Sequence, residues 1–282
     1  MDSSFFSLLI FVVITLLYYL ALKPKLNASA FDDPTGSEYA AYSSSNNTAL
    51  FIYFLFIVLT QVAVNASVMV NKCGGSLLQN IGSAFLMTMI PWIFIFGGVI
   101  AALMMFPGFK SAFSNVIGYF AVSNSANNIL SELLVNTDLN QAINSAATTG
   151  AEPAKINSLK SAAEAIVKLS GNMSILINQI VPSNFMEYWA MLVPLMKEQY
   201  QAGAPEMKQQ LLDVVVMRDN IGEALWYIYT AILLISITQY NIMSRPCSQD
   251  VATMQQNQEK YLKTESKINA TADKANSKIY TY

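Results

Sequence analysis

Four long apolar runs, separated by polar segments, dominate the hydropathy pattern along the chain. They are Phe5–Leu22, Leu50–Val70, Ala84–Phe106 and Ala224–Met243. None of them contains Asp, Glu, Lys or Arg. A helix of about 20 mostly apolar residues is long enough to cross the hydrocarbon core of a bilayer. The pattern therefore predicts four transmembrane helices.

The first run admits a second interpretation, a cleaved signal peptide, because Ala28, Ser29 and Ala30 resemble a cleavage site. We favour a retained anchor. The preceding residues MDSS contain no basic side chain, and the run is longer than the usual apolar core of a signal peptide.

These runs divide the chain into segments and set the expected fold class. We expect an all-α integral membrane protein, with four transmembrane helices and an α-helical extramembrane domain between spans three and four. The segments are 1–22, the first transmembrane anchor; 23–49, a polar loop; 50–106, the second and third transmembrane helices; 107–223, an interfacial helix and the extramembrane domain; 224–243, the fourth transmembrane helix; and 244–282, a polar tail that contains lysines.

The long segment between the third and fourth spans has a helical period of apolar positions. In Lys155–Leu169 these positions recur three and four residues apart, as on one face of a helix. No run of strand length alternates with a period of two. Further helices are expected over Glu132–Ala147, Asn184–Gln201 and Pro205–Ile221. The tail 246–282 has too few apolar residues to fold alone.

The stretch FPGFKSAFSNVIGYF, residues 106–120, follows the third span directly. Pro107 cannot continue the hydrogen-bond ladder of that span, and Gly108 permits a turn. Beyond the break, aromatic and aliphatic residues recur at helical spacing, which is typical of a helix in the plane of the membrane interface. Lys110 is expected to point to lipid headgroups or to a partner. The expected membrane-interface residues are Phe109, Lys110, Phe113, Ile117 and Phe120.

Small residues in the third span predict close helix packing. Gly97 with Ala101, and Gly98 with Ala102, form two small-xxx-small pairs, which let helix backbones approach one another. The partner is either another span of the chain or a second copy, which would make a homo-oligomer.

Four amides in or near the spans, Gln61, Asn65, Gln239 and Asn241, have two interpretations. They could line a polar path through the membrane. More often such residues form hydrogen bonds between helices.

Cys73 follows the second span and Cys247 follows the fourth, so both are expected on the same side of the membrane. A disulfide between them stays open. Free thiols that behave as small buried apolar side chains are the commoner case.

Lys23 and Lys25, after the first span, favour an outside N-terminus and a cytosolic segment 107–223.

Composition limits the chemistry that the chain can perform. Charged residues make up 12% of it, against about 25% in soluble domains. The net charge is −2 and there is no histidine. We therefore expect no nucleic-acid partner, no metal or cofactor, no catalytic residues and no enzymatic activity. The glycine-rich stretch 73–83 also lacks the lysine of a phosphate-binding loop.

Residues 84–122, and FPGFKSAFSNVIGYF in particular, resemble an element of the membrane-embedded minor capsid proteins of large icosahedral double-stranded DNA viruses, such as chlorovirus-like particles. The resemblance implies a structural protein of the inner virion membrane. Its partners would be the lipid bilayer and capsid proteins or other membrane virion proteins, and it implies no catalytic residues. The alternatives are a channel or small transport subunit, and a tetraspan protein that fuses or shapes membranes.

Overall fold

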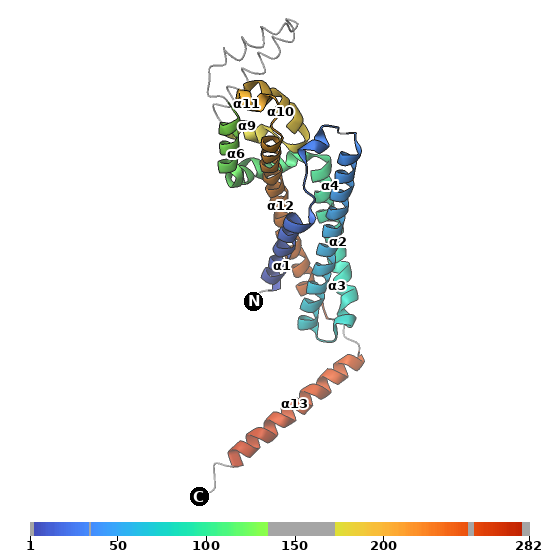
Figure 1. The fold of residues 1–282 in the computed structure, drawn as a ribbon. Coiled ribbons are helices and arrows are strands. Elements are labelled where there is room, and N and C mark those ends of the chain that lie inside the picture. Colours follow the sequence, from blue (N-terminus) through green and yellow to red (C-terminus); the bar gives the residue numbers. More distant parts are fainter. Residues whose placement is uncertain (1–2, 34, 135–172, 248–250, 278–282) are drawn as a thin grey trace.

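The structure, a computed structural model, describes residues 3–33, 35–134, 173–247 and 251–277 (Figure 1). It is all-α, as predicted. Four helical segments are long and apolar enough to cross a membrane: Ser3–Leu22, Ser37–Cys73, Leu77–Met105 and Pro205–Ser244. The expected helix Lys155–Leu169 lies outside the described residues, and so does Glu132–Ala147 except for residues 132–134.

The first span consists of α1 (Ser3–Leu17) and a π-helical turn, Tyr18–Leu22. The second, α2, begins at Ser37 rather than at the expected Leu50 and ends at Cys73. The interpretation of 23–49 as a loop is therefore wrong in its second half. No glycine or proline interrupts 37–49, so the helix that crosses the membrane continues beyond it. Between the first span and α2, the described residues contain a short 3₁₀ turn, Ala28–Phe31.

A tight turn reverses the chain after α2. Gly74 and Gly75 adopt φ angles of 74° and 79°, which glycine tolerates and other residues rarely adopt. Ser76 and Gln79 then form a capping box at the start of α3 (Leu77–Pro91), which satisfies two otherwise unpaired N–H groups. A π-helical turn, Trp92–Phe96, follows the proline and leads into α4 (Gly97–Met105).

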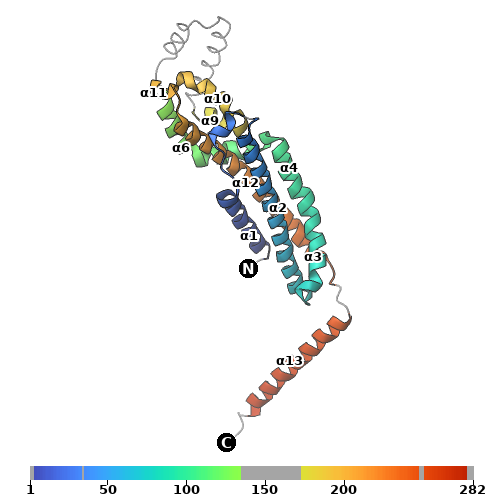
Figure 2. The same cartoon turned by 45° about the vertical axis from the view of Figure 1, so that its right-hand side comes forward.

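The expected break after the third span is present. Phe106 leaves the helical conformation, with φ −128° and ψ 73°, and a 3₁₀ turn begins at Pro107 and ends at Lys110. The chain then runs through α5 (Ser111–Phe113), a π-helical turn (Ser114–Gly118) and α6 (Tyr119–Leu133). Figures 1 and 2 both show this green segment turning aside from the direction of α4. We call residues 107–120 the elbow.

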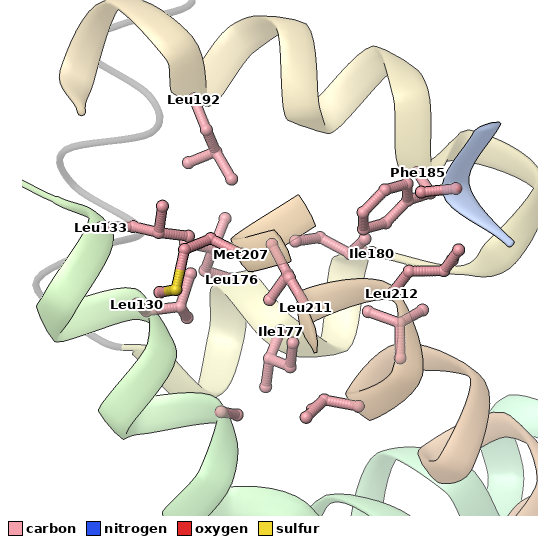
Figure 3. Packing of buried hydrophobic residues seen from close by; sticks show 14 of the residues in the cluster. Leu130, Leu133, Leu176, Ile177, Ile180, Phe185, Leu192, Met207, Leu211 and Leu212 are labelled. Atoms are coloured by element: carbon pink, nitrogen blue, oxygen red, sulfur yellow. The ribbon is translucent and has the colours of Figure 1, made fainter. Parts of the chain in front are cut away.

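Beyond the elbow, short helices form a domain that we call the head. They are α6, α9 (Met173–Gln179), α10 (Phe185–Leu192), α11 (Glu198–Gln201) and the first half of α12 (Pro205–Ser244). Leucine and isoleucine side chains from α6, α9 and α12 point toward one another, with Phe185 and Leu192 of α10 closing the group (Figure 3). The head therefore has its own apolar core outside the four-helix bundle.

α12 is one uninterrupted helix of 40 residues. The expected boundary between a head helix ending at Ile221 and a span beginning at Ala224 does not exist. Its first half carries Leu211, Leu212 and Val215 into the head core, and its second half carries Tyr227 and Leu234 into the bundle core. Gly222 and Glu223 lie between the two expected segments, and both keep the helical conformation.

The bundle has an aromatic core and an apolar exterior. Phe11, Tyr53, Trp92 and Phe96 are buried at its centre and pack ring against ring. The outer surface exposes large apolar side chains such as those of Phe51, Phe56, Leu86 and Phe94. Apolar side chains on the outside of a filled bundle are what a bilayer requires.

The tail forms a helix, α13 (Val251–Ser277). In Figures 1 and 2 it extends away from the bundle, and the side chains of 254–271 are exposed. The expectation that the tail packs no core of its own agrees with this exposure. Its helical structure was not expected.

Candidate functional site: the Glu223 cluster and its cavity

Where the head joins the bundle, charged side chains surround one carboxylate. Glu223 Oε2 lies 2.6 Å from Lys110 Nζ, and Glu223 Oε1 lies 3.2 Å from Lys23 Nζ. Lys110 also contacts Asp219 Oδ2 at 3.1 Å. The hydroxyls of Tyr19 and Tyr227 donate to Glu223 Oε1 at 2.9 and 3.3 Å. We call this group the Glu223 cluster.

Three chain segments contribute to the cluster. Lys23 follows the first span, Lys110 lies in the elbow, and Asp219 and Glu223 lie one turn apart on α12. Carboxylates four residues apart occupy the same face of a helix. Lys23 additionally donates to Asn220 Oδ1 at 2.7 Å. The cluster therefore ties the end of the first span and the elbow to the middle of α12.

The side chains of Glu223 and Lys110 are only 7% and 15% exposed. Burial acts to lower the pKa of Lys110, but the adjacent Glu223 and Asp219 carboxylates outweigh it, and the pKa is raised. Burial lowers the pKa of Lys23, and its longer contact with Glu223 does not compensate. The two lysines thus share one carboxylate unequally, and the Lys110–Glu223 pair is the stronger.

These contacts correct the expected role of Lys110. Its ammonium is not exposed on the outer face of the elbow but is largely buried against α12, where the carboxylates of Asp219 and Glu223 pair with it. The same holds for Lys23, which was expected to act as a flanking charge. Sequence reasoning overlooked Glu223 as their common partner, although a carboxylate one residue before an apolar run was a visible signal.

The other expected interface residues divide into two groups. Phe109, Ile117 and Phe120 are exposed. Phe113 instead packs edge-on against Trp226 of α12, with ring centroids 5.2 Å apart. Trp226 Nε1 also donates to the carbonyl of Phe109 at 2.9 Å. One face of the elbow thus contacts α12, and the opposite face carries exposed apolar side chains.

The closest helix approach is not where the small-residue pairs predicted it. Gly97 faces the ring of Phe54, and Gly98 has nothing within 4 Å of where a Cβ would stand. Ala101 is exposed and Ala102 is partly buried. The elbow and α12 approach more closely. A Cβ on Gly222 would lie 2.8 Å from the Lys110 carbonyl oxygen, and one on Gly118 would lie 2.6 Å from the Arg218 carbonyl oxygen.

The polar residues of the spans form a hydrogen-bond chain that joins all four of them. Ser3 of α1 donates to Gln239 of α12, Gln239 donates to Asn65 of α2, and Asn65 donates to Thr88 of α3, at 3.3, 3.0 and 2.9 Å. Gln61 likewise bonds with Ser7, at 2.6 Å.

Asn241, by contrast, is exposed on the outer surface. The buried amides therefore hold helices together, which is the commoner of the two interpretations.

The opposite end of the bundle is closed covalently. Cys73 and Cys247 form a disulfide with Cα atoms 5.3 Å apart, so the interpretation as free thiols is wrong. Beside it, Lys72 Nζ donates to the carbonyls of Ile242 and Met243 at 2.8 and 2.7 Å. A lysine at this position satisfies carbonyls that a helix end leaves unpaired. The ends of α2 and α12 are thus fixed to each other.

A cavity of about 570 Å³ adjoins the Glu223 cluster. Its charged wall consists of Lys23, Lys110, Asp219 and Glu223, and further walls come from the first turns of α2 and the end of α4. Among the described residues, no three His, Cys, Asp or Glu side chains are grouped so as to hold a metal ion.

No protein-family model, curated protein or solved structure matches the chain.

Proposed function

We propose that this chain is a structural membrane protein, a minor capsid protein that anchors an inner viral membrane to the capsid shell and supports capsid assembly. The observation that carries the proposal is α12. Its 40 residues correspond to about 60 Å of continuous helix. One rigid element belongs to both the head core and the membrane bundle, so a protein that contacts the head is mechanically connected to the bilayer.

The fixed ends of the bundle support the same role. The Glu223 cluster holds the elbow and the first span to α12 on the head side. The disulfide Cys73–Cys247 holds α2 to α12 on the other side. A bundle whose helices are held together at both ends suits a structural anchor better than a protein that must open and close during its function.

Protein surface is available on both sides of the bundle for neighbours in a shell. The head lies at one end, and α13 extends from the other (Figure 1). On α13, Met254, Tyr261 and Ile268 are exposed and follow one another every seven residues, which places them along one stripe of the helix. A stripe of this kind suits contact with a neighbouring helix.

A channel has less support from the structure. The buried amides of the spans are bonded to one another and the bundle centre is filled by aromatic rings. If the chain conducted ions, liposomes that contain it would show flux above empty liposomes, and substitution of Asn65 or Gln239 would change that flux. We expect no flux.

The deciding experiment is cross-linking mass spectrometry on intact particles. We expect the protein in purified virions at a fixed ratio to the major capsid protein, with cross-links from Lys197 or Lys208 of the head to a capsid protein. Lys263 of α13 serves as the matched probe of the opposite face. Absence from particles, or cross-links only to host membrane proteins, would refute the proposal.

A further inference from the structure

The cavity beside the Glu223 cluster lies at the level where the four spans end on the head side. Tyr18 and Lys23 come from the end of the first span, Leu50 from the second, Leu103 from the third, and Glu223 from the start of the fourth apolar run. Its volume of about 570 Å³ falls within the range of small-molecule sites, about 300–1,000 Å³. The cavity therefore lies at the membrane interface, where lipid headgroups are the most concentrated ligands.

The cavity has a charged wall on the head side and an apolar wall on the bundle side, as an amphiphilic ligand requires. The head side carries Lys110 and Asp219, and the bundle side carries Leu50, Leu103 and Met104. Met104 is exposed, whereas Leu50 and Leu103 are buried. A molecule with a charged group and acyl chains can place the former at the cluster and the latter along α4 toward the bilayer.

The charges indicate a zwitterionic headgroup. Two lysines and two carboxylates line the cavity, so its formal charge is zero. An ammonium group has three N–H donors, and the contacts of Lys110 with Asp219 and Glu223 occupy two of them. The third can donate to a phosphate. The Asp219 carboxylate can accept from a ligand ammonium.

Asn46 indicates what kind of ammonium group the ligand carries. Its Oδ1 is buried in the wall of the cavity and has no hydrogen-bond partner. A buried acceptor without a donor is costly, and a ligand N–H would satisfy it. A primary ammonium has such hydrogens and a trimethylammonium has none. Tyr39 and Tyr42 also line the cavity, and aromatic rings attract either kind of cation.

We infer that this cavity binds the headgroup of an ethanolamine phospholipid. Its phosphate accepts from Lys110, its primary ammonium donates to Asn46 Oδ1 and Asp219, and its acyl chains lie against Leu103 and Met104. The bound lipid fills the interface between α2, α4 and the elbow.

The test is native mass spectrometry of the full chain, released from nanodiscs that contain equal parts of phosphatidylethanolamine, phosphatidylcholine and phosphatidylglycerol. We expect one retained phosphatidylethanolamine, preferred about tenfold over phosphatidylcholine, the discrimination that one unpaired buried group provides. Equal retention of the three lipids, or preference for phosphatidylglycerol, would overturn the inference. Tight competition by free phosphoethanolamine would also overturn it, because the site would then take a soluble ligand.

Asn46→Leu and Asn47→Leu form a matched pair on neighbouring positions of α2, since Asn47 is exposed. Asn46→Leu should abolish the preference over phosphatidylcholine, and Asn47→Leu should preserve it. An unchanged preference in Asn46→Leu, with an unchanged circular dichroism spectrum, would contradict the role of Asn46. If that variant does not fold, the preference of the unaltered chain among the three lipids still decides.

Discussion

At the scale of single residues, Glu223 is the position on which the junction between head and bundle depends. Glu223→Gln keeps the shape of the side chain but removes its negative charge. Lys23 then loses its carboxylate partner, and Lys110 loses the closer of its two. Removing one partner of a buried ion pair costs about 3–5 kcal/mol. We expect Glu223→Gln to lower the free energy of unfolding by about 3 kcal/mol, measured by denaturant titration in detergent.

Glu259→Gln is the control for Glu223→Gln, because Glu259 is exposed on α13. It should change the free energy of unfolding by less than about 0.5 kcal/mol. Combining Lys110→Met with Glu223→Gln should cost less than the sum of the two single changes, since the residues share one contact. Full additivity would mean that the ion pair contributes nothing.

The close crossing of the elbow and α12 makes a second prediction about one residue. A Cβ on Gly222 would meet the Lys110 carbonyl oxygen at 2.8 Å and the Ser114 Cβ at 2.7 Å. Gly222→Ala should therefore destabilise the protein by about 1–3 kcal/mol through overpacking. Gly98→Ala, where a Cβ has open space, should be neutral or slightly stabilising in the same thermal-melt assay. The reverse order would place the tight contact at Gly98, as the small-residue pairs suggested.

These residues also mark what the sequence could not tell. Apolar runs identify spans because the bilayer imposes a minimum length on each one separately. The partner of Lys110, however, is 113 positions further along the chain, and the crossing at Gly222 depends on the path of the elbow. Both are consequences of tertiary packing. The break at Pro107 could be predicted because proline acts locally, whereas the burial of Lys110 could not.

At the scale of helices, the hydrogen-bond chain through Asn65 should determine how firmly the four spans associate. Asn65→Ala removes the partner of both Gln239 and Thr88. Bonds between membrane helices contribute about 0.6–2 kcal/mol each. We expect Asn65→Ala to lower stability by about 1–3 kcal/mol, measured by steric trapping in bicelles. Asn241→Ala, on the exposed face of α12, should have little effect, and equal effects would show that the chain of bonds is not what joins the helices.

Helix boundaries depend on more than span length. α2 and α12 extend well beyond the apolar runs that predicted them, α2 before Leu50 and α12 before Ala224. The apolar pattern reports where the bilayer ends, not where the helix ends. Polar helical turns continue outside the membrane and there form the walls of the head and of the cavity. The turns of α2 before Leu50 were therefore missed, whereas a helix over Pro205–Ile221 was expected but not its continuity with the fourth span.

At the scale of the whole molecule, four crossings place the N-terminus, the disulfide and α13 on one side, and the head on the other. Disulfides persist in oxidising compartments and are rare in the cytosol. The side of Cys73 and Cys247 should therefore be the lumenal or outer one, and the head should face the cytosol. This agrees with the orientation that Lys23 and Lys25 favoured, although Lys23 is buried.

The Asn-x-Ser/Thr triplets make that orientation measurable. Asn269 lies on α13, whereas Asn27 and Asn46 lie on the head side. Only triplets exposed to the secretory lumen receive a glycan. We expect a single glycan when the chain is made in the presence of microsomes, removed by endoglycosidase and abolished by Asn269→Gln, with Asn27→Gln as the unaffected control. A glycan at Asn27 would invert the topology, and it would place the head, and any shell that it contacts, on the lumenal side of the membrane.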